Sequence, residues 1–269
     1  MNICVCIKQV PDTNEIKVDP VTHTLVRKGV PSIVNPFDTY AQEVGVRLKE
    51  KLGGKVVVIS MGPEQAKEAI KTCLSVGADA GYLISSRKFG GSDTLATSYI
   101  LSEAIKAVEE KEGLKFDLIL CGKQAVDGDT AQVGPQIAEK LNIPQVTYAA
   151  DIKKEGNSLT VKRLLEDGYM TVQVQTPCLI TCVKELNEVR YMTVKGILEC
   201  WDKPLTVLDY NALKDEPLID PTTIGLKGSP TNVFRSFTPP QKGAGQILGG
   251  TAAEAAKELA SLLAKKHAI

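Results

Sequence analysis

Five continuous apolar runs constrain the fold of this chain more than any other feature. Runs without polar alternation are typical of strands that are covered on both faces, as in a parallel sheet. Between them, apolar residues recur at helical spacing, for example at Val133, Ile137 and Leu141. The alternation predicts a doubly wound α/β domain with a mostly parallel sheet. The runs are residues 2–7, 55–60, 81–85, 116–121 and 145–149.

One connection and one pair of further segments depart from this alternation. About 28 residues (8–35) separate the first strand from the first helix, and a connection of that length usually serves a function or carries a small hairpin. Segments 158–163 and 171–175 flank Asp167-Gly168 and predict a β-hairpin, which a strand at 178–182 follows.

The last third of the chain has weaker apolar periodicity. Six prolines punctuate it before an amphipathic helix predicted at 252–265. We expect an α/β domain over residues 1–185, with its hairpin at about 151–182. Residues 186–269 are expected to form a partner-recognition loop and an extended arm that packs on another subunit.

Composition excludes several classes of function. The 269 residues include 32 Lys+Arg and 32 Asp+Glu with no basic cluster, which argues against binding along a nucleic-acid backbone. No apolar run reaches roughly 18 residues, so we expect neither a membrane span nor a signal peptide. The two histidines, His23 and His267, disfavour imidazole-based catalysis and His-rich metal sites. Any chemistry is therefore expected to come from a cofactor.

The cysteines point to a reducing compartment. Seven Cys at irregular spacings fit free thiols in the cytoplasm better than a disulfide framework. Cys178 and Cys182 have no second pair to complete a zinc site, so they are expected to be buried strand residues.

Glycines and hydroxyl side chains gather where three of the predicted strands end. Residues 122–134 follow the fourth strand, and Asp129 and Thr130 are suited to cap a helix that begins near Ala131. Residues 85–94 follow the third strand and residues 61–64 the second. Because ligands of open α/β sheets bind beyond the carboxyl ends of the strands, these helix starts together favour a dinucleotide.

Other interpretations of these segments stay open at this point. Each one alone also fits an ordinary strand-to-helix turn with its cap. The string 90–94 (GGSDT) resembles the pyrophosphate loop of ATP pyrophosphatases. Those enzymes place the loop after their first strand, whereas here it follows the third, which argues against an adenylating enzyme. A purely structural role would leave three phosphate-favouring strand ends as a coincidence.

The whole chain resembles electron-transfer flavoprotein β subunits. The resemblance rests on five segments in the expected order, which are 7–13 (IKQVPDT), 35–38 (NPFD), 61–63 (MGP), 122–129 (GKQAVDGD) and 186–191 (LNEVRY). It implies a Rossmann-like, adenine-nucleotide-binding fold, a homologous α subunit as partner, and a C-terminal arm that embraces that partner. Ordinary members bury an AMP in β, while the redox FAD belongs mainly to α.

The resemblance also implies which residues contact the nucleotide. They match the family's motif at Cys6, Asn35, Pro36, Phe37, Asp38, Met61, Gly122, Lys123, Gln124, Ala125, Val126, Asp127, Gly128, Asp129, Thr130, Ala131, Gln132 and Val133.

Two segments resemble the electron-bifurcating branch, in which a second FAD replaces the AMP. One is 127–135 (DGDTAQVGP), where Gly128 would relieve crowding beside the diphosphate. The other is 91–98 (GSDTLATS), whose Asp93, Thr94 and Thr97 would hold the additional flavin portion. Met170 departs from the pattern, because relatives often carry an acidic residue there. Candidate cations near the diphosphate or the flavin ring are Lys8, Arg87 and Lys123, for which solvated surface positions are the alternative.

The branch implies a concrete activity for the complex, although not for this chain alone. NADH gives a hydride to the FAD in β, one electron passes through the FAD of α to a high-potential acceptor, and the other goes to ferredoxin or flavodoxin. The segment 190–195 matches the family's recognition loop, in which Arg190, Tyr191 and the anchor residue Val194 would meet an acyl-CoA dehydrogenase or a related flavoenzyme. The alternative is a simple shuttle that holds a structural AMP and takes electrons from acyl-CoA dehydrogenases.

Overall fold

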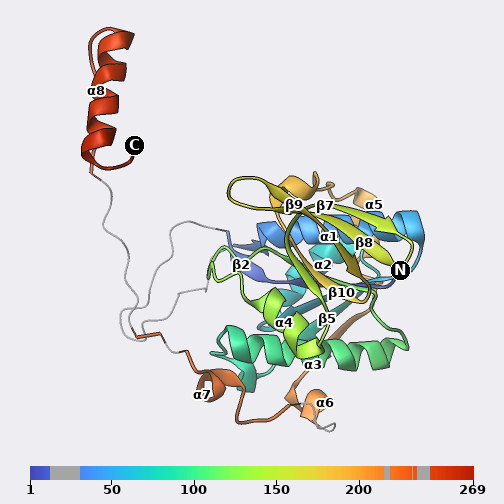
Figure 1. Ribbon diagram of the computed structural model, residues 1–269. Coiled ribbons are helices and arrows are strands. Elements are labelled where there is room, and N and C mark those ends of the chain that lie inside the picture. Colours follow the sequence, from blue (N-terminus) through green and yellow to red (C-terminus); the bar gives the residue numbers. More distant parts are fainter. Residues whose placement is uncertain (13–30, 215–218, 232, 235–242) are drawn as a thin grey trace. The chain divides into compact units, whose positions relative to one another are not determined.

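The computed structural model describes residues 1–12, 31–214, 219–231, 233–234 and 243–269. Contacts divide the chain into two units, and Figure 1 traces them. The first comprises residues 1–17 and 25–234, and the second comprises residues 18–24 and 235–269. Within the described ranges, no helix is both long and apolar enough to cross a membrane.

A nine-stranded sheet organises the first unit in the part that the structure describes. Its strand order is β11-β5-β4-β1-β6-β10-β7-β8-β9, and all neighbours pair in parallel except β7 with β8 and β8 with β9, which are antiparallel. The strands are β1 (Ile3–Ile7), β4 (Val56–Met61), β5 (Ala80–Ile84), β6 (Leu118–Gly122), β7 (Gln145–Glu155), β8 (Ser158–Leu164), β9 (Tyr169–Gln175), β10 (Cys178–Cys182) and β11 (Leu205–Leu208). The predicted α/β class with a mostly parallel sheet and a hairpin is confirmed.

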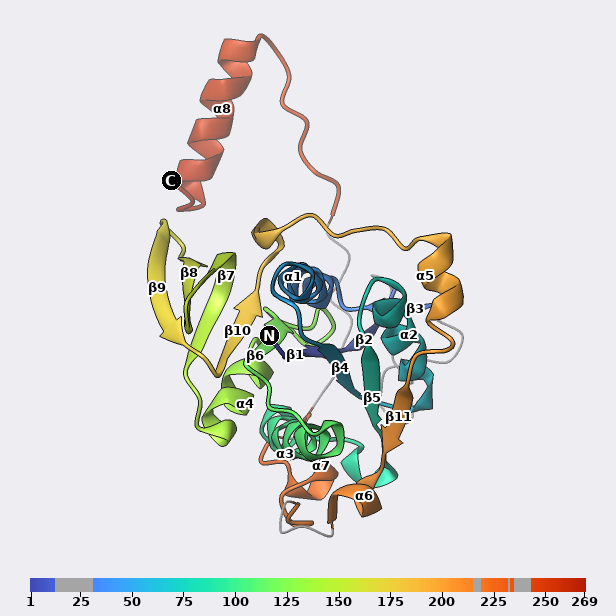
Figure 2. The same cartoon turned by 90° about the vertical axis from the view of Figure 1, so that its right-hand side faces the viewer.

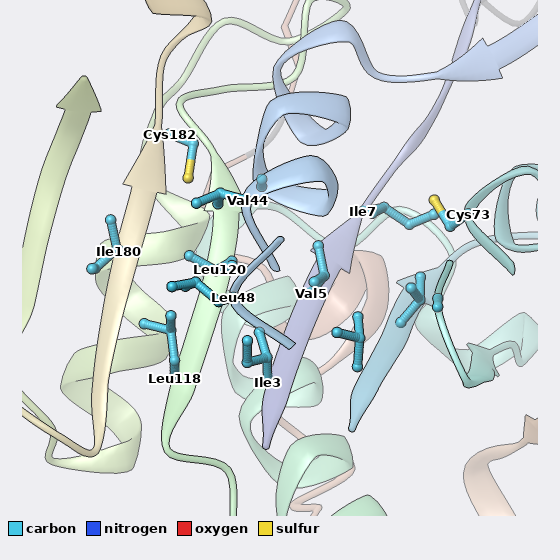
Figure 3. Close-up of a cluster of buried hydrophobic side chains, with 14 of the residues drawn as sticks. Ile3, Val5, Ile7, Val44, Leu48, Cys73, Leu118, Leu120, Ile180 and Cys182 are labelled. Carbon is cyan, nitrogen blue, oxygen red and sulfur yellow. The ribbon is translucent and has the colours of Figure 1, made fainter. Parts of the chain in front are cut away.

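Helices cover both faces of the sheet, as Figure 2 shows with α1 and α3 on opposite sides. Because strand side chains alternate between faces, neighbouring residues of one strand enter two different cores. Val5 packs with α1 and α2 in one cluster, part of which Figure 3 shows, while Cys4 packs with α3 in the other. The helices of this unit are α1 (Pro36–Leu52), α2 (Lys67–Ser75), α3 (Thr94–Glu112), α4 (Val133–Leu141), α5 (Val194–Glu199), α6 (Tyr210–Lys214) and α7 (Gly225–Gly228).

The long connection after β1 contains a short antiparallel pair of strands. A small hairpin was one of the two alternatives that its length predicts. Strand β2 (Gln9–Pro11) pairs with β3 (Ser32–Val34). Most of the segment between them, residues 13–30, lies outside the described residues.

Residues beyond 185 add more to the first unit than the sequence indicates. β11 pairs in parallel with β5 at the edge of the sheet. Leu213, Ile219 and Ile224 are buried in the cluster under α3. The division at 185/186 stays a prediction, because it concerns which part of the chain recognises partners.

The cysteines are free and buried throughout the described ranges. Cys178 and Cys182 lie in the central strand β10, as the apolar pattern predicts. Burial raises the pKa of the Cys178 thiol to about 11, which keeps it protonated at neutral pH.

The described part of the second unit contains helix α8 (Ala252–Lys265), at the predicted bounds. Thr251 begins it with a capping box, because its hydroxyl accepts from the amide of Glu254 and the Glu254 carboxylate accepts from the Thr251 amide. None of the residues of α8 is buried, although Ala255, Leu259 and Leu262 form an apolar stripe. Its packing on a partner subunit stays a prediction.

Candidate functional site

The order in which the chain adds strands to the sheet reverses between β1 and β6, which are parallel neighbours. The chain leaves β1 toward α1 on one face and leaves β6 toward α4 on the other (Figure 2). Their carboxyl ends, Ile7 and Gly122, therefore lie where doubly wound sheets bind ligands, and we call this position the crevice. The strand order predicts this place, and the structure brings the two segments together there.

Asp38 in the first turn of α1 connects the two strand ends. Its Oδ2 accepts from the backbone amide of Lys8 at 2.7 Å and its Oδ1 from the amide of Gly122 at 3.1 Å. The Nδ2 of Asn35 donates to the same Oδ1 at 2.9 Å. A side chain at Gly122 would put its Cβ 2.2 Å from that oxygen, so only glycine permits this approach.

Burial dominates the ionisation of Asp38. It raises the pKa of this carboxyl to about 7, against the opposing effect of its hydrogen bonds from Asn35, Lys8 and Gly122. Three donors around one buried carboxyl make this residue the centre of the strand-end network.

Asn35 extends the network to the loop that follows β6. It is fully buried, its Nδ2 also donates to the carbonyl of Gln124 at 2.8 Å, and its Oδ1 accepts from the amide of Val126 at 3.1 Å. Asp127 of the same loop has a carboxylate oxygen 2.5 Å from the ammonium of Lys8, which follows β1. Within the loop, Gln124 Nε2 donates to Asp129 at 2.7 Å. Asp127 thus neutralises Lys8 and Asp129 shapes the loop.

The loop backbone is held in an unusual conformation. Asp129 and Ala131 have φ angles of 52° and 53°, in the left-handed region that non-glycine residues seldom occupy. Such strain clusters at functional sites. The following α4 starts without a side-chain cap, and within the described ranges the amides of Val133 and Gly134 have no hydrogen-bond acceptor. Unpaired amides at a helix start favour a phosphate.

The segment after a third strand, β5, reaches this crevice at the start of α3. Asp93 is the N-cap of α3, and its carboxylate accepts from the Ala96 amide at 2.9 Å. The hydroxyl of Thr94 donates to Gln132 Oε1 at 3.0 Å, which ties the first turn of α3 to the loop before α4. Thr97 lies one turn further along α3, half-buried.

Some of the remaining predicted residues lie at the crevice, and Arg87 lies apart from it. Cys6 is buried and pairs in register with Cys121 across β1 and β6. Met61 ends β4 and is half-buried. Lys123 lies with its Nζ 5.3 Å from the ring centroid of Tyr148, whereas Arg87 is exposed on the turn after β5. The other predicted residues lie in the first turn of α1 or in the β6–α4 connection, namely Pro36, Phe37, Ala125, Gly128 and Thr130.

The predicted recognition loop is rigidly attached to α1. The Arg190 guanidinium donates to Glu43 at 2.9 Å and to Glu50 at 2.6 Å. Burial opposes ionisation of Glu43, but the hydrogen bonds from Arg190 and Arg47 hold the pKa of its carboxyl below the usual range. Arg190 therefore anchors the loop, and its direct contact with a partner stays a prediction.

Beyond this anchor the loop presents apolar side chains to solvent. Tyr191 is 94% exposed and Val194, the first residue of α5, is 77% exposed. Leu198 and Trp201 continue the surface, at 67% and 66% exposed. A group of large exposed apolar side chains on a fixed support is typical of a protein-docking surface.

The comparisons with known proteins fit this geometry. Residues 22–210 match the electron transfer flavoprotein domain, which covers more than half of the chain. The chain belongs to the electron transfer flavoprotein family. It is 51% identical, over the whole of both chains, to an electron transfer flavoprotein subunit beta of Thermoanaerobacterium thermosaccharolyticum. The resemblance to β subunits is thereby confirmed.

Two further full-length relatives of this electron transfer flavoprotein subunit carry more specific names. The chain is 57% identical to acryloyl-CoA reductase electron transfer subunit gamma of Anaerotignum propionicum. It is 51% identical to caffeyl-CoA reductase-Etf complex subunit CarD of Acetobacterium woodii. In each case all of both chains is covered.

Sequence reasoning missed one group of residues near the crevice. Residues 219–231 pack on the turn at 90–93, where Ser229 Oγ accepts from the Asp93 amide at 2.8 Å and Asp93 Oδ2 accepts from the Thr231 amide at 3.0 Å. The segment carries a polar pattern with two prolines, Pro221 and Pro230, and so resembles a linker. Its two buried isoleucines, Ile219 and Ile224, are the signal that could have indicated packing.

Proposed function

We propose that this chain is the FAD-binding β subunit of an electron-bifurcating electron transfer flavoprotein. The complex with an α subunit would oxidise NADH, sending one electron through the FAD of α to a high-potential acceptor and the other to ferredoxin or flavodoxin. The names of the two reductase-associated relatives support an acyl-CoA-type reductase or dehydrogenase as the high-potential partner. The free buried thiols support a reducing, cytoplasmic setting.

The observation that carries the proposal is the bond between Thr94 and Gln132. It places the hydroxyl-bearing first turn of α3 against the loop that borders the crevice. A site for AMP alone needs only the ends of β1 and β6, whereas a dinucleotide is larger and needs a further protein surface, or wall, to line its site. Residues 93–97 are positioned to provide that wall.

The residues present fit an adenine dinucleotide. Val133 and Gly134 at the start of α4 offer amides to a phosphate, and Lys8 and Lys123 lie at the same edge of the sheet. Ser60 supplies a further polar atom, because it pairs with Ile7 at the ends of β4 and β1 and its buried hydroxyl has no hydrogen-bond partner among the described residues. Buried polar groups without a partner are uncommon, and a ligand would satisfy this one.

The chain's own residues would bind and orient the cofactor, which supplies hydride acceptance and one-electron transfer when bound. Asn35 and Asp38 hold the two strand ends at a fixed separation. Lys8 is already paired with Asp127, so the positive charge that it adds to the site is partly compensated. Nearby charges of this kind set a flavin's potential.

The second candidate is the simple shuttle with AMP in this site. The crevice between β1 and β6 would hold AMP equally well, since the Asn35 and Asp38 network does not depend on α3. The bond from Thr94 to Gln132 favours the larger ligand.

Replacing Thr94 and Thr97 by Val tests the role of α3. We expect the double variant, purified with its α subunit, to lose most of the FAD bound by this chain and to keep the FAD of α. Each lost hydrogen bond to a ligand costs about 1 kcal/mol, so the two together would weaken FAD by roughly tenfold to thirtyfold. The measurement is FAD per heterodimer after dialysis.

A matched control is Thr72→Val on α2, because the Thr72 hydroxyl donates to the Glu68 carbonyl of its own helix. Its flavin content is expected to equal that of the unaltered protein. Undiminished flavin in the Thr94 and Thr97 double variant would remove the role assigned to α3.

A further inference from the structure

The chain that leads out of the first unit is fastened to the turn in front of α3. We call residues 219–231 the arm root. Besides the bonds of Ser229 and Thr231 to Asp93, the Gly225 amide donates to Ser92 Oγ at 3.0 Å and the Leu226 amide to the Gly90 carbonyl at 3.1 Å. Four hydrogen bonds therefore join the arm root to Gly90, Ser92 and Asp93 of this turn.

This contact is a packed one. Gly225 lies so close that a Cβ there would be 2.3 Å from the Lys88 carbonyl oxygen, and its φ of +64° also favours glycine. Ser229 is buried, and Ile224 enters the core beneath α3. The arm root and the turn are thus held as a single rigid structure.

Asp93 connects this structure to the crevice. One carboxylate oxygen accepts from Ala96 in α3 and the other from Thr231 in the arm root. Burial acts in the opposite direction, but these amides hold the pKa of Asp93 below its usual range, so the carboxylate stays ionised as an acceptor of both. The next residue, Thr94, reaches Gln132 on the other side.

We infer that the arm root positions the first turn of α3 through its bonds to Asp93, which makes Ser229 a positioning residue for the flavin part of the site. This inference rests on the proposed function, since that function assigns residues 93–97 to the flavin portion. It goes further by connecting this part of the site to residues that do not border the crevice. The ends of β1 and β6 are fixed by Asn35 and Asp38 instead, so the AMP portion would not depend on the arm root.

Selective loss of FAD affinity is the expected consequence. In Ser229→Ala the Asp93 amide loses its acceptor, and in Asp93→Asn the side-chain amide can still cap α3 but places its NH2 group opposite the Thr231 amide. We expect each variant to bind FAD about tenfold more weakly, with the affinity for AMP within twofold of the unaltered protein.

The experiment uses the full heterodimer, freed of the nucleotide in this chain, with FAD and AMP titrated separately by equilibrium dialysis. FAD is counted beyond the one molecule that α binds. Thr222→Val is the control, since its hydroxyl donates to Asp220 within the arm root without touching residues 90–93. Thermal unfolding is recorded for every variant.

Each result decides the question. A tenfold loss for FAD alone supports the positioning role. Equal FAD affinity, or a parallel loss of FAD and AMP that marks a general structural defect, overturns it. If the unaltered heterodimer takes up AMP but no second FAD, the proposed function fails and the inference fails with it, which separates that failure from one seen only in the variants.

Discussion

Asp38→Ala is expected to lower the free energy of unfolding by about 3 kcal/mol and to remove the bound nucleotide. The change leaves the amides of Lys8 and Gly122 and the side-chain amide of Asn35 without their shared acceptor inside the protein. Each buried donor left unpaired costs about 1–3 kcal/mol, while relief of the buried carboxyl offsets part of the sum. Because the same bonds fix the crevice, nucleotide affinity is expected to fall at least a hundredfold.

The neighbouring residue provides the control. Thr39 follows Asp38 in α1, and its hydroxyl donates to the carbonyl of Pro36 at 2.6 Å. Thr39→Ala is expected to change the free energy of unfolding by less than about 1 kcal/mol and to retain nucleotide. Urea unfolding of the heterodimer, with nucleotide content measured on the same samples, compares the two. Equal behaviour of both variants would contradict the central place given to Asp38.

Val194→Asp is expected to slow electron delivery to the partner flavoenzyme about a hundredfold while leaving flavin content unchanged. Val194 lies at the centre of the exposed apolar loop, so a carboxylate there must lose its water when a partner docks. A hundredfold loss corresponds to roughly 3 kcal/mol, which is typical of a central interface residue. The charge would not harm α5 itself, since a negative group at a helix N-terminus is favourable.

A graded series at the same position separates docking from other effects. Val194→Leu is expected to keep most of the rate and Val194→Ala to lose roughly tenfold, because the buried apolar area changes in that order. The measurement is kcat/KM of the partner-dependent reaction, with flavin per heterodimer as the internal control. A normal rate for Val194→Asp would exclude this loop from docking.

The strands could be predicted from sequence because of their burial. Residues covered on both faces must be apolar, and the run 178–182 is β10 itself. β11 escaped prediction because it is short and lies at the edge of the sheet, where Val207 is partly exposed and the apolar signal is weak. Helix α8 was predicted at its exact bounds, since its cap and its apolar stripe are both local features.

Some contacts of the candidate site could likewise be predicted from the sequence, and others could not. That the ends of β1 and β6 meet follows from strand order, so the approach of Lys8 to Asp127 could be anticipated. The engagement of Arg190 with Glu43 and Glu50 could not, because these residues are about 140 positions apart and nothing local connects them. The attachment of the arm root to residues 90–93 is likewise a long-range contact made largely by backbone amides, which leave little trace in side-chain patterns.

The nucleotide content of the heterodimer tests the proposed function most directly. The chain is purified with its α subunit, the ligands are released by acid, and FAD and AMP are quantified per heterodimer. The proposed function predicts about two FAD and no AMP. One FAD together with one AMP would contradict it and leave this chain the β subunit of a simple electron shuttle.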